Sequence, residues 1–270
     1  MKKRKQIDQA AGLRALMQPA LPRLVVSVAA HEAALRHDGF MQLARAGAQL
    51  GHELLLLDGS RGELAQLLKL RIRYELIHLL EGEKRFDEVA QELPHQEGLR
   101  YLPAQRGLRA LAEVQGGMRN LLQGFAQLQR APDFVVAHGG PDLIPTLVEL
   151  AVVEGNMIWR VTPRPEVITA TYAQLKIVAR KYPTLRHRVW LHGVLDSEDA
   201  DHAFANLAEA AQRFLGVELQ YLGFTGQSSG PVEDATLQPD ARVHCLANIL
   251  FQGAADRWHA AEEIPETQHV

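Results

Sequence analysis

The feature that most constrains the fold is an alternation of short apolar runs with longer helical patterns. The runs are rich in Leu and β-branched residues, and most lack strict polar alternation, which is typical of strands covered on both faces. This order predicts a single α/β domain with a mostly parallel sheet and helices on both of its faces. The expected strands are 24–28, 53–58, 99–102, 134–138, 157–162, 189–194 and 219–223. The expected helices are 40–51, 61–70, 106–129, 142–153, 165–182 and 198–215.

Composition narrows the class of protein. An apolar content of 47% in 270 residues allows a full core, and a net charge of −3 provides no overall field for nucleic acid. The single cysteine, Cys245, cannot form an internal disulfide. No apolar run reaches the roughly 18 residues of a membrane span, and no apolar signal core follows the basic start MKKRKQ. We therefore expect a cytoplasmic globular protein with no nucleic-acid partner.

Three parts of the chain differ in character. Residues 1–22 are basic and then helical in pattern, and are interrupted by two prolines. Residues 23–240 carry the strand–helix alternation. Residues 241–270 combine a further apolar pattern with a polar tail that we expect to be frayed.

Several stretches resemble one family. LARAGAQLGHELLLLDG resembles the helix and second strand that follow a P-loop, and EGLRYLPAQRG a third strand and its turn. VTPRPEVITATYAQLKIVAR and AEAAQRFLGVELQYLGF are similar to later segments of the FlhG branch of the MinD/ParA class of P-loop ATPases, which have a deviant Walker A loop. The resemblance spans roughly residues 8–240 and implies a P-loop NTPase fold and a regulator of flagellar placement or number.

A motif near the start of the chain strengthens the resemblance. DQAAGLR resembles the DQAxxLR motif of the family, a segment that binds FlhF, a GTPase of the signal-recognition-particle type, and stimulates its GTP hydrolysis. The resemblance therefore implies a GTPase-activating segment that uses Asp8, Gln9, Ala10, Leu13 and Arg14. Gln9 is expected to reach the GTPase site, where a Gln can orient the attacking water. Ala10 and Leu13 would dock the helix, and Arg14 would pair with an acidic or phosphate-bearing surface.

The loop where the family binds phosphate has lost its glycines. Residues 29–38 read AAHEAALRHD, so that His31 and Arg36 stand at the two lysine positions and His37 at the Mg²⁺-binding Thr. A P-loop depends on Gly backbones that turn their N–H groups toward phosphate. Ala, Leu and Glu resist those backbone angles, and two acidic residues in this loop would repel a nucleotide.

Three further positions of the family's nucleotide site have changed. Ser60 replaces the Asp that helps to orient water, His138 the Walker B Asp, and His192 the Asn that reads adenine. Mg²⁺ prefers hard oxygen ligands, so His138 is a poor substitute. Because several elements have changed together, we expect a pseudo-ATPase that binds neither ATP nor Mg²⁺. An anion site built from His31, Arg36 and His37 is an alternative.

Clustered histidines raise the question of a metal site. The inferred topology places His138 and His192 at the ends of neighbouring strands, with His31 and His37 nearby. No HxxxH or Cys/His spacing supports such a site, so polar residues that fill an emptied pocket are the simpler interpretation.

The front segment has one apolar stripe within residues 6–17. Ile7, Ala10, Leu13 and then Leu16 or Met17 recur at helical spacing. A helix this short is marginal in water, so we expect it to become ordered when it binds a partner. Packing on its own domain and membrane anchoring beside the basic start are the alternatives.

The C-terminal pattern and the partners leave further alternatives. Residues 241–257 have apolar spacing but no Lys- or Arg-rich face, so we expect core packing, and membrane contact is doubtful. The resemblance also allows a flagellar transcriptional regulator or basal-body component as a partner, and recruitment to the cell pole. An ATPase with an unorthodox loop and a scaffold for another polar or secretion system remain alternative functions.

Overall fold

An eight-stranded sheet forms the centre of the protein. The computed structural model describes residues 20–34, 37–94, 96–194, 196–226 and 241–252, with His37 and Asp38 described by their backbone alone. The strand order is β3-β4-β2-β5-β1-β6-β7-β8, and these strands pair in parallel except for β3 with β4. The strands are β1 Arg23–Ala29, β2 Leu54–Asp58, β3 Gln91–Glu92, β4 Leu99–Pro103, β5 Phe134–Gly139, β6 Asn156–Val161, β7 Arg186–His192 and β8 Leu219–Thr225. The predicted α/β fold is confirmed.

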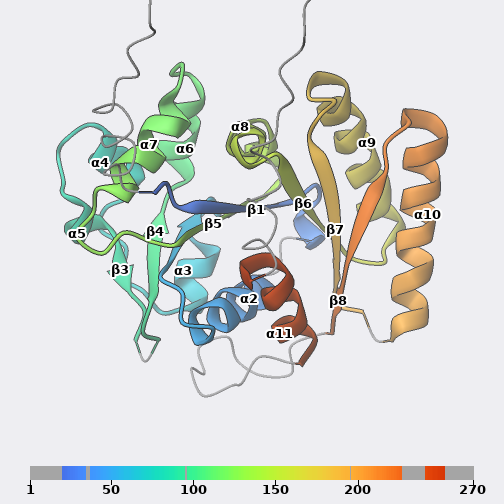
Figure 1. Ribbon diagram of the computed structural model, residues 1–270, viewed down its shortest axis with the longest axis horizontal. Coiled ribbons are helices and arrows are strands. Elements are labelled where there is room, and N and C mark those ends of the chain that lie inside the picture. Colours follow the sequence, from blue (N-terminus) through green and yellow to red (C-terminus); the bar gives the residue numbers. More distant parts are fainter. Residues whose placement is uncertain (1–19, 35–36, 95, 195, 227–240, 253–270) are drawn as a thin grey trace, which may run out of the picture.

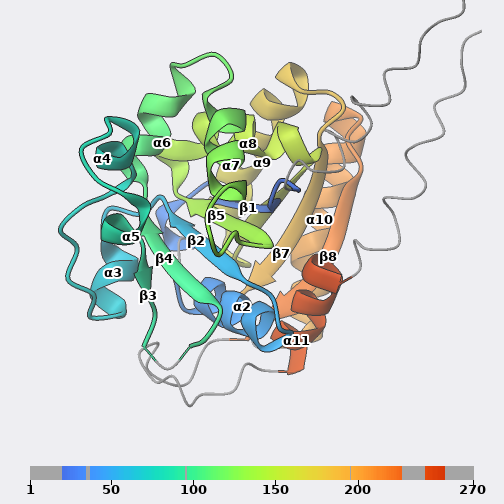
Figure 2. The same ribbon diagram turned by 60° about the vertical axis from the view of Figure 1, so that its left-hand side comes forward.

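Helices cover the sheet on both faces (Figures 1 and 2). One face is covered by α6, α7, α8, α9 and α10, and the other, which we call the α2 face, by α2, α3 and α11. The helices are α2 His37–Gln49, α3 Glu63–Leu67, α4 Leu76–Leu80, α5 Phe86–Val89, α6 Gln105–Ala112, α7 Gly117–Ala126, α8 Ile144–Glu154, α9 Pro165–Lys181, α10 Ser197–Leu215 and α11 Ala241–Ala247. Shorter turns are η1 Glu32–Ala34, η2 Pro141–Leu143 and the π-helical η3 Asn248–Gln252.

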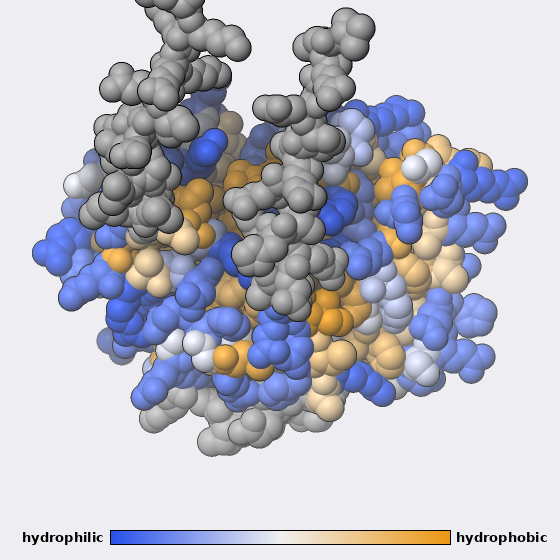
Figure 3. All heavy atoms as spheres, in the orientation of Figure 1, coloured by the Kyte–Doolittle hydropathy of each residue, from blue (hydrophilic) through white to orange (hydrophobic). Residues whose placement is uncertain are grey.

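The core has two halves, one on each side of the sheet. All four leucines of Leu54–Leu57 are fully buried, and they alternate between the two apolar clusters. Trp159 packs in one cluster and Trp190 in the other. Burial on both sides explains why the central strands read as continuous apolar runs. In Figure 3 hydrophilic side chains surround the rim of the molecule, and apolar ones show between them toward the middle.

The structure differs from the sequence prediction at several elements. The predicted helix 106–129 is two helices, because Gly116 has a φ of 72° and breaks the run between α6 and α7. The two-residue strand β3 and the short helices α4 and α5 were not predicted, since each has too few residues for a periodic signal. Strand β7 begins at Arg186 rather than Val189, because basic residues at its exposed start hid the strand pattern.

The expected core packing of the C-terminal segment is confirmed for its described part. Val243, Leu246 and Leu250 are buried, whereas Ile249 is 42% exposed. The ring of Phe251 approaches α2 so closely that a Cβ at Gly47 would lie 2.7 Å from it. This segment therefore belongs to the core of the α2 face. The front segment 1–19 and the tail 253–270 lie outside the described residues.

Candidate functional site

The candidate site lies at the carboxyl edge of the sheet, where the parallel strands β1, β2 and β5 end. Register pairs Asp58 of β2 with His138 of β5, and His138 in turn with Ser27 of β1. All three side chains are buried. Open α/β sheets bind ligands at this edge, beyond the ends of their strands. Two positions predicted from the sequence, Ser60 and His138, therefore lie together with Asp58 here.

The loop after β1 uses its own backbone donors. The N–H of Ala33 donates to Nδ1 of His31 at 3.1 Å, and the N–H of Ala34 donates to the carbonyl of His31 at 2.9 Å. Ala34 is fully buried. A phosphate-binding loop needs such N–H groups to point at the anion. Here two of them close the turn η1 instead.

The remaining loop positions lie largely outside the described residues. Arg36 is not described, and His37 is described only by its backbone, as the first residue of α2. His192, at the end of β7, places Nε2 2.9 Å from the carbonyl oxygen of Ala34. That contact ties the loop to the sheet, and it gives His192 a structural partner within the protein.

Asp58 is the centre of a buried hydrogen-bond network. It accepts from the N–H of Ser60 at 2.8 Å, from the Ser60 hydroxyl at 3.0 Å and from the Tyr101 hydroxyl at 2.5 Å. Nε2 of His138 lies 2.8 Å from its Oδ1. Burial alone would raise the pKa of Asp58, but the hydrogen bonds from His138, Tyr101 and Ser60 outweigh it and lower the pKa to about 2. Asp58 is therefore an ionised carboxylate whose oxygens accept three hydrogen bonds and also face Nε2 of His138.

His138 connects this carboxylate to a buried cation. Its Nδ1 lies 3.4 Å from an Nη2 nitrogen of Arg160, and its ring lies 4.1 Å from the ring of Phe40. Complete burial lowers the pKa of His138, against the opposing effect of Asp58, so the imidazole is neutral near pH 7. A proton on Nε2 fits both neighbours, since that nitrogen then donates to Asp58 while Nδ1 accepts from Arg160.

Arg160 supplies the positive charge of this network. It lies near the end of β6 and is 1% exposed, and its guanidinium carbon is 5.7 Å from the centre of the Phe40 ring. One carboxylate, one guanidinium and a neutral imidazole leave no net charge at this edge of the sheet. Buried charges are tolerated when they are paired and hydrogen-bonded in this way.

Two residues of the network are not predicted by the sequence analysis. Arg160 is a charged residue inside an otherwise apolar strand, MIWRV, and this was the available signal. Tyr101 lies in β4 and carries no motif that points to Asp58. Sequence distance hides both contacts, because only the sheet order brings β4 and β6 toward β2 and β5.

The expected neighbourhood of His138 and His192 is wrong. Strands β5 and β7 are separated by β1 and β6, so the two histidines do not end neighbouring strands. Among the described residues, no group of three His, Cys, Asp or Glu side chains is placed to hold a metal ion. The two histidines have separate roles, one in the Asp58 network and one on the loop after β1.

The predicted GTPase-activating residues Asp8, Gln9, Ala10, Leu13 and Arg14 lie outside the described residues. The described chain joins that segment at Ala20 and Leu21, which are both exposed. No helix within the described ranges combines the length and the apolar character that crossing a bilayer requires.

Comparisons with known proteins give one relative in sequence and several in overall fold. No protein-family model matches the sequence. The chain is 27% identical over 186 residues to the antiactivator FleN of Pseudomonas aeruginosa, an alignment that covers 68% of this chain and 66% of FleN. The chain thus spans slightly less than two thirds of that relative's length.

Solved structures share the fold over most of the chain. The MinD cell division protein of Aquifex aeolicus matches with a TM-score of 0.63 at 14% identity, over 85% of this chain and 97% of MinD. The septum site-determining protein MinD of Pyrococcus horikoshii, solved with Mg-ADP, matches with a TM-score of 0.63 at 15% identity, over 88% and 99% of the two chains. The chain is thus similar in sequence to FleN, of the FlhG/FleN branch, and has the fold of the MinD/ParA class of P-loop ATPases.

Proposed function

We propose that this chain is a FleN-like regulator of flagellar placement or number, and that it is a pseudo-ATPase. The similarity to FleN supports the regulatory role. The buried network of Asp58, His138 and Arg160 carries the second part of the proposal, because it occupies the edge where this class of fold binds a magnesium nucleotide.

The residues at this edge do not fit Mg²⁺. The ion needs carboxylate or water oxygens in a nearly octahedral shell. The oxygens of Asp58 already accept from Ser60 and Tyr101 and face Nε2 of His138 at 2.8 Å, and the Walker B position holds this imidazole. Arg160 adds a buried cation next to that imidazole, and a cation there disfavours a metal ion. We therefore propose that neither ATP nor Mg²⁺ is a cofactor of this chain.

Calorimetric titration with Mg-ATP and with Mg-ADP tests the loss of nucleotide binding. We expect no saturable heat for a Kd tighter than about 1 mM, which corresponds to about −4 kcal/mol of binding free energy. The Pyrococcus horikoshii MinD, solved with Mg-ADP, is the positive control for the titration. Saturable micromolar binding would overturn the pseudo-ATPase proposal and favour the alternative, an ATPase with an unorthodox loop. Arg160→Met would then show whether the buried cation holds the nucleotide.

We further propose that residues 8–14, DQAAGLR, stimulate an FlhF-type GTPase. The motif supports this role, and the segment is joined to the domain at exposed residues rather than inside the core. Gln9 would orient water in the partner's active site, while Ala10 and Leu13 would dock a short helix and Arg14 would pair with a negative surface. The α/β domain would then carry the activating segment.

GTP turnover by the cognate FlhF-type GTPase tests this mechanism. We expect stimulation by the full chain and by a synthetic peptide of residues 1–22. Gln9→Ala should return turnover to its unstimulated level, whereas Gln18→Ala, the same change outside the motif, should leave the stimulation intact. Full stimulation by Gln9→Ala would refute the role of that residue. No stimulation by chain or peptide would instead favour the scaffold alternative.

The name of FleN, an antiactivator, suggests a second partner. By similarity we propose that this chain also contacts a flagellar transcriptional regulator or a basal-body component, with recruitment to the cell pole. Fluorescence imaging of the tagged chain with and without the FlhF-type GTPase tests the recruitment, and a diffuse signal in both strains would contradict it.

A further inference from the structure

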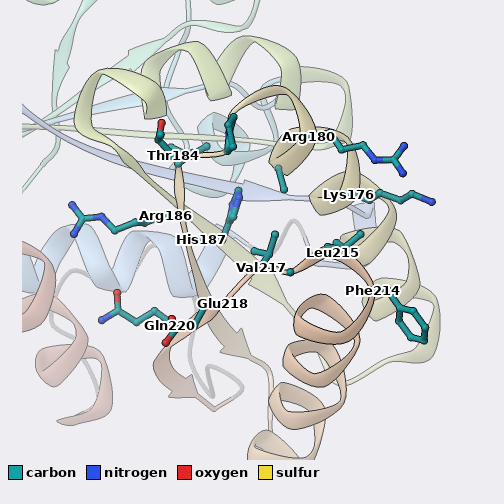
Figure 4. A pocket seen from close by; sticks show the side chains of 14 residues that line it. Lys176, Arg180, Thr184, Arg186, His187, Phe214, Leu215, Val217, Glu218 and Gln220 are labelled. Atoms are coloured by element: carbon teal, nitrogen blue, oxygen red, sulfur yellow. The ribbon is translucent and has the colours of Figure 1, made fainter.

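A second polar region lies at the opposite edge of the sheet from the Asp58 network. A cavity of about 730 Å³ opens where β7 and β8 begin, between the C-terminal ends of α9 and α10 (Figure 4). Its volume falls within the range of small-molecule sites, roughly 300–1,000 Å³. We call it the β7–β8 cavity. It is lined by His187, by three cations and by several apolar side chains.

His187 supplies a fixed hydrogen-bond donor to this cavity. The side chain lines the cavity, although the residue is only 3% exposed. Its Nδ1 accepts a hydrogen bond from the indole N–H of Trp159 at 3.2 Å. Burial lowers the pKa of His187 to about 4, so the ring is neutral near pH 7 and its proton must be on Nε2. Packing therefore holds one N–H donor of known tautomer in the cavity wall.

Three cations line the same cavity, with Lys176 and Arg180 extending on one side of His187 and Arg186 on the other (Figure 4). Lys176 and Arg180 come from α9, and Arg186 is the first residue of β7 (Figure 4). No salt bridge joins any of the three to another described residue within 4.0 Å, in contrast to the adjacent Lys181, which pairs with Glu149 at 3.6 Å. Among the described residues that line the cavity, Glu218 is the one acid. The charged side chains of the wall therefore sum to +2, which favours an anion.

The rest of the wall is largely apolar. Leu185 is buried, Leu215 and Val217 are partly buried, and Phe214 is 67% exposed at the rim. A large exposed aromatic beside a cavity offers contact area to a ligand with an apolar body. A bare inorganic ion would leave this surface unused.

We propose that the β7–β8 cavity binds a small organic anion, an apolar body that carries a carboxylate, phosphate or sulfonate group. Arg180, Arg186 and Lys176 attract the anionic group, and the Nε2–H of His187 fixes its orientation. Leu215, Val217 and Phe214 contact the apolar body. The strand β7 would then connect this cavity at its start with the loop contact of His192 at its end.

Fluorescence titration of the full chain with 1-anilinonaphthalene-8-sulfonate tests the proposal. The neutral N-phenyl-1-naphthylamine has the same aromatic body without the sulfonate and is the matched ligand control. We expect saturable binding of the sulfonate, and binding of the neutral probe weaker by about tenfold or more, the typical effect of a charge-assisted hydrogen bond. Equal affinities for both probes would refute an anion site.

Substitutions of residues that line the β7–β8 cavity test whether the sulfonate binds there. Arg180→Gln with Arg186→Gln should raise the Kd of the sulfonate about tenfold or more. The control pair Arg73→Gln with Arg119→Gln removes the same charge from exposed positions that do not line the cavity, and should leave the Kd unchanged. An unchanged Kd in the first pair, with both pairs folded by circular dichroism, would overturn the proposal. His187→Phe, which keeps a ring but removes the donor, should also weaken sulfonate binding.

Discussion

The two edges of the sheet each contain a buried histidine, but the polar groups around these two histidines differ in their partners. At the carboxyl edge His138 lies between Asp58 and Arg160, so each buried charge has an internal partner. At the amino edge His187 has one internal partner, Trp159, and faces a cavity whose three cations have no salt-bridge partner among the described residues. The first arrangement stabilises the fold, and the second leaves polar groups available to a ligand. A buried polar side chain therefore indicates a binding site only when some of its hydrogen-bonding groups have no partner within the protein and can bind a ligand.

The largest effect on stability should follow from a substitution in the Asp58 network at the carboxyl edge of the sheet. Asp58→Ala would leave the hydroxyl of Tyr101 and the N–H and hydroxyl of Ser60 without their acceptor in the buried network. Each buried donor left without an acceptor is costly, and for several of them together we expect the free energy of unfolding to fall by about 3–5 kcal/mol. Urea denaturation followed by circular dichroism measures the change.

Asp142→Ala is the control for that experiment. Asp142 makes ion pairs with Arg61 and Arg109 on the surface, so its removal deletes two charged contacts in water. An exposed pair contributes about 0–1 kcal/mol, so the control, which removes two, should lose no more than about 2 kcal/mol. Similar losses for the two variants would mean that the Asp58 network is not the stabilising unit described here.

The free energy of unfolding should depend on pH through the two buried histidines, one at each edge of the sheet. The folded chain holds His187 at a pKa of about 4, below the ordinary value of 6.5, and burial lowers the pKa of His138 as well. The unfolded chain therefore takes up protons first as the pH falls. The contribution of the neutral, buried His187 to the free energy of unfolding is complete above pH 6.5 and is lost as the pH falls toward 4. For His187 this loss is about 3 kcal/mol.

His187→Phe should flatten this pH dependence without abolishing it, since His138 still contributes. His202→Gln, at an exposed position of α10, should keep the wild-type dependence. Urea unfolding at several pH values between about 4.5 and 7 measures both variants. Asp58 does not interfere, because its stabilisation is lost only below pH 3.8, as the pH falls through its folded pKa of about 2. An unaltered slope in His187→Phe would show that His187 does not titrate on unfolding.

A smaller effect should come from two glycines inside helices. A Cβ at Gly47 of α2 would lie 2.7 Å from Phe251 and 2.9 Å from Leu54, whereas a Cβ at Gly124 of α7 meets nothing within 4 Å. Gly47→Ala should therefore destabilise by about 1–3 kcal/mol through overpacking. Gly124→Ala should stabilise by about 0.5–1 kcal/mol through helix propensity.

Thermal unfolding of the two glycine variants gives changes of opposite sign if the α2 face is as tightly packed as described. A stabilised Gly47→Ala would show that α2 and η3 separate easily, and that the α2 face is less tightly packed than the contacts of Phe251 indicate.

The central strands were predictable because each is buried on both faces and therefore reads as an apolar run. Leu54–Leu57 and Phe134–Ala137 needed no knowledge of their neighbours. The edge of the sheet was less predictable, because the exposed Arg186 at the start of β7 resembles a loop residue in the sequence. Short elements such as β3 and α5 form through tertiary contacts, and four or fewer residues carry no period.

The candidate site was predictable only in part. The family resemblance singled out Ser60 after one strand and His138 near the end of another, and the structure brings both to Asp58. Sequence order could not show that β5 and β7 are separated by two strands, since strand order depends on crossovers rather than on chain order. For the same reason Tyr101 and Arg160 emerged as partners of this network only in the folded chain.

The sequence by itself determined the class of fold, the buried strands and the absence of glycine from the loop after β1, because these depend on local periodicity and residue type. The tertiary structure decided which polar groups meet. It paired a carboxylate at the end of β2 with a guanidinium from β6 through His138, and it left the cations at the start of β7 beside an open cavity. The physical reason is that the energy of a buried charge depends on the partners within a few ångströms of it, and those partners come from distant parts of the chain.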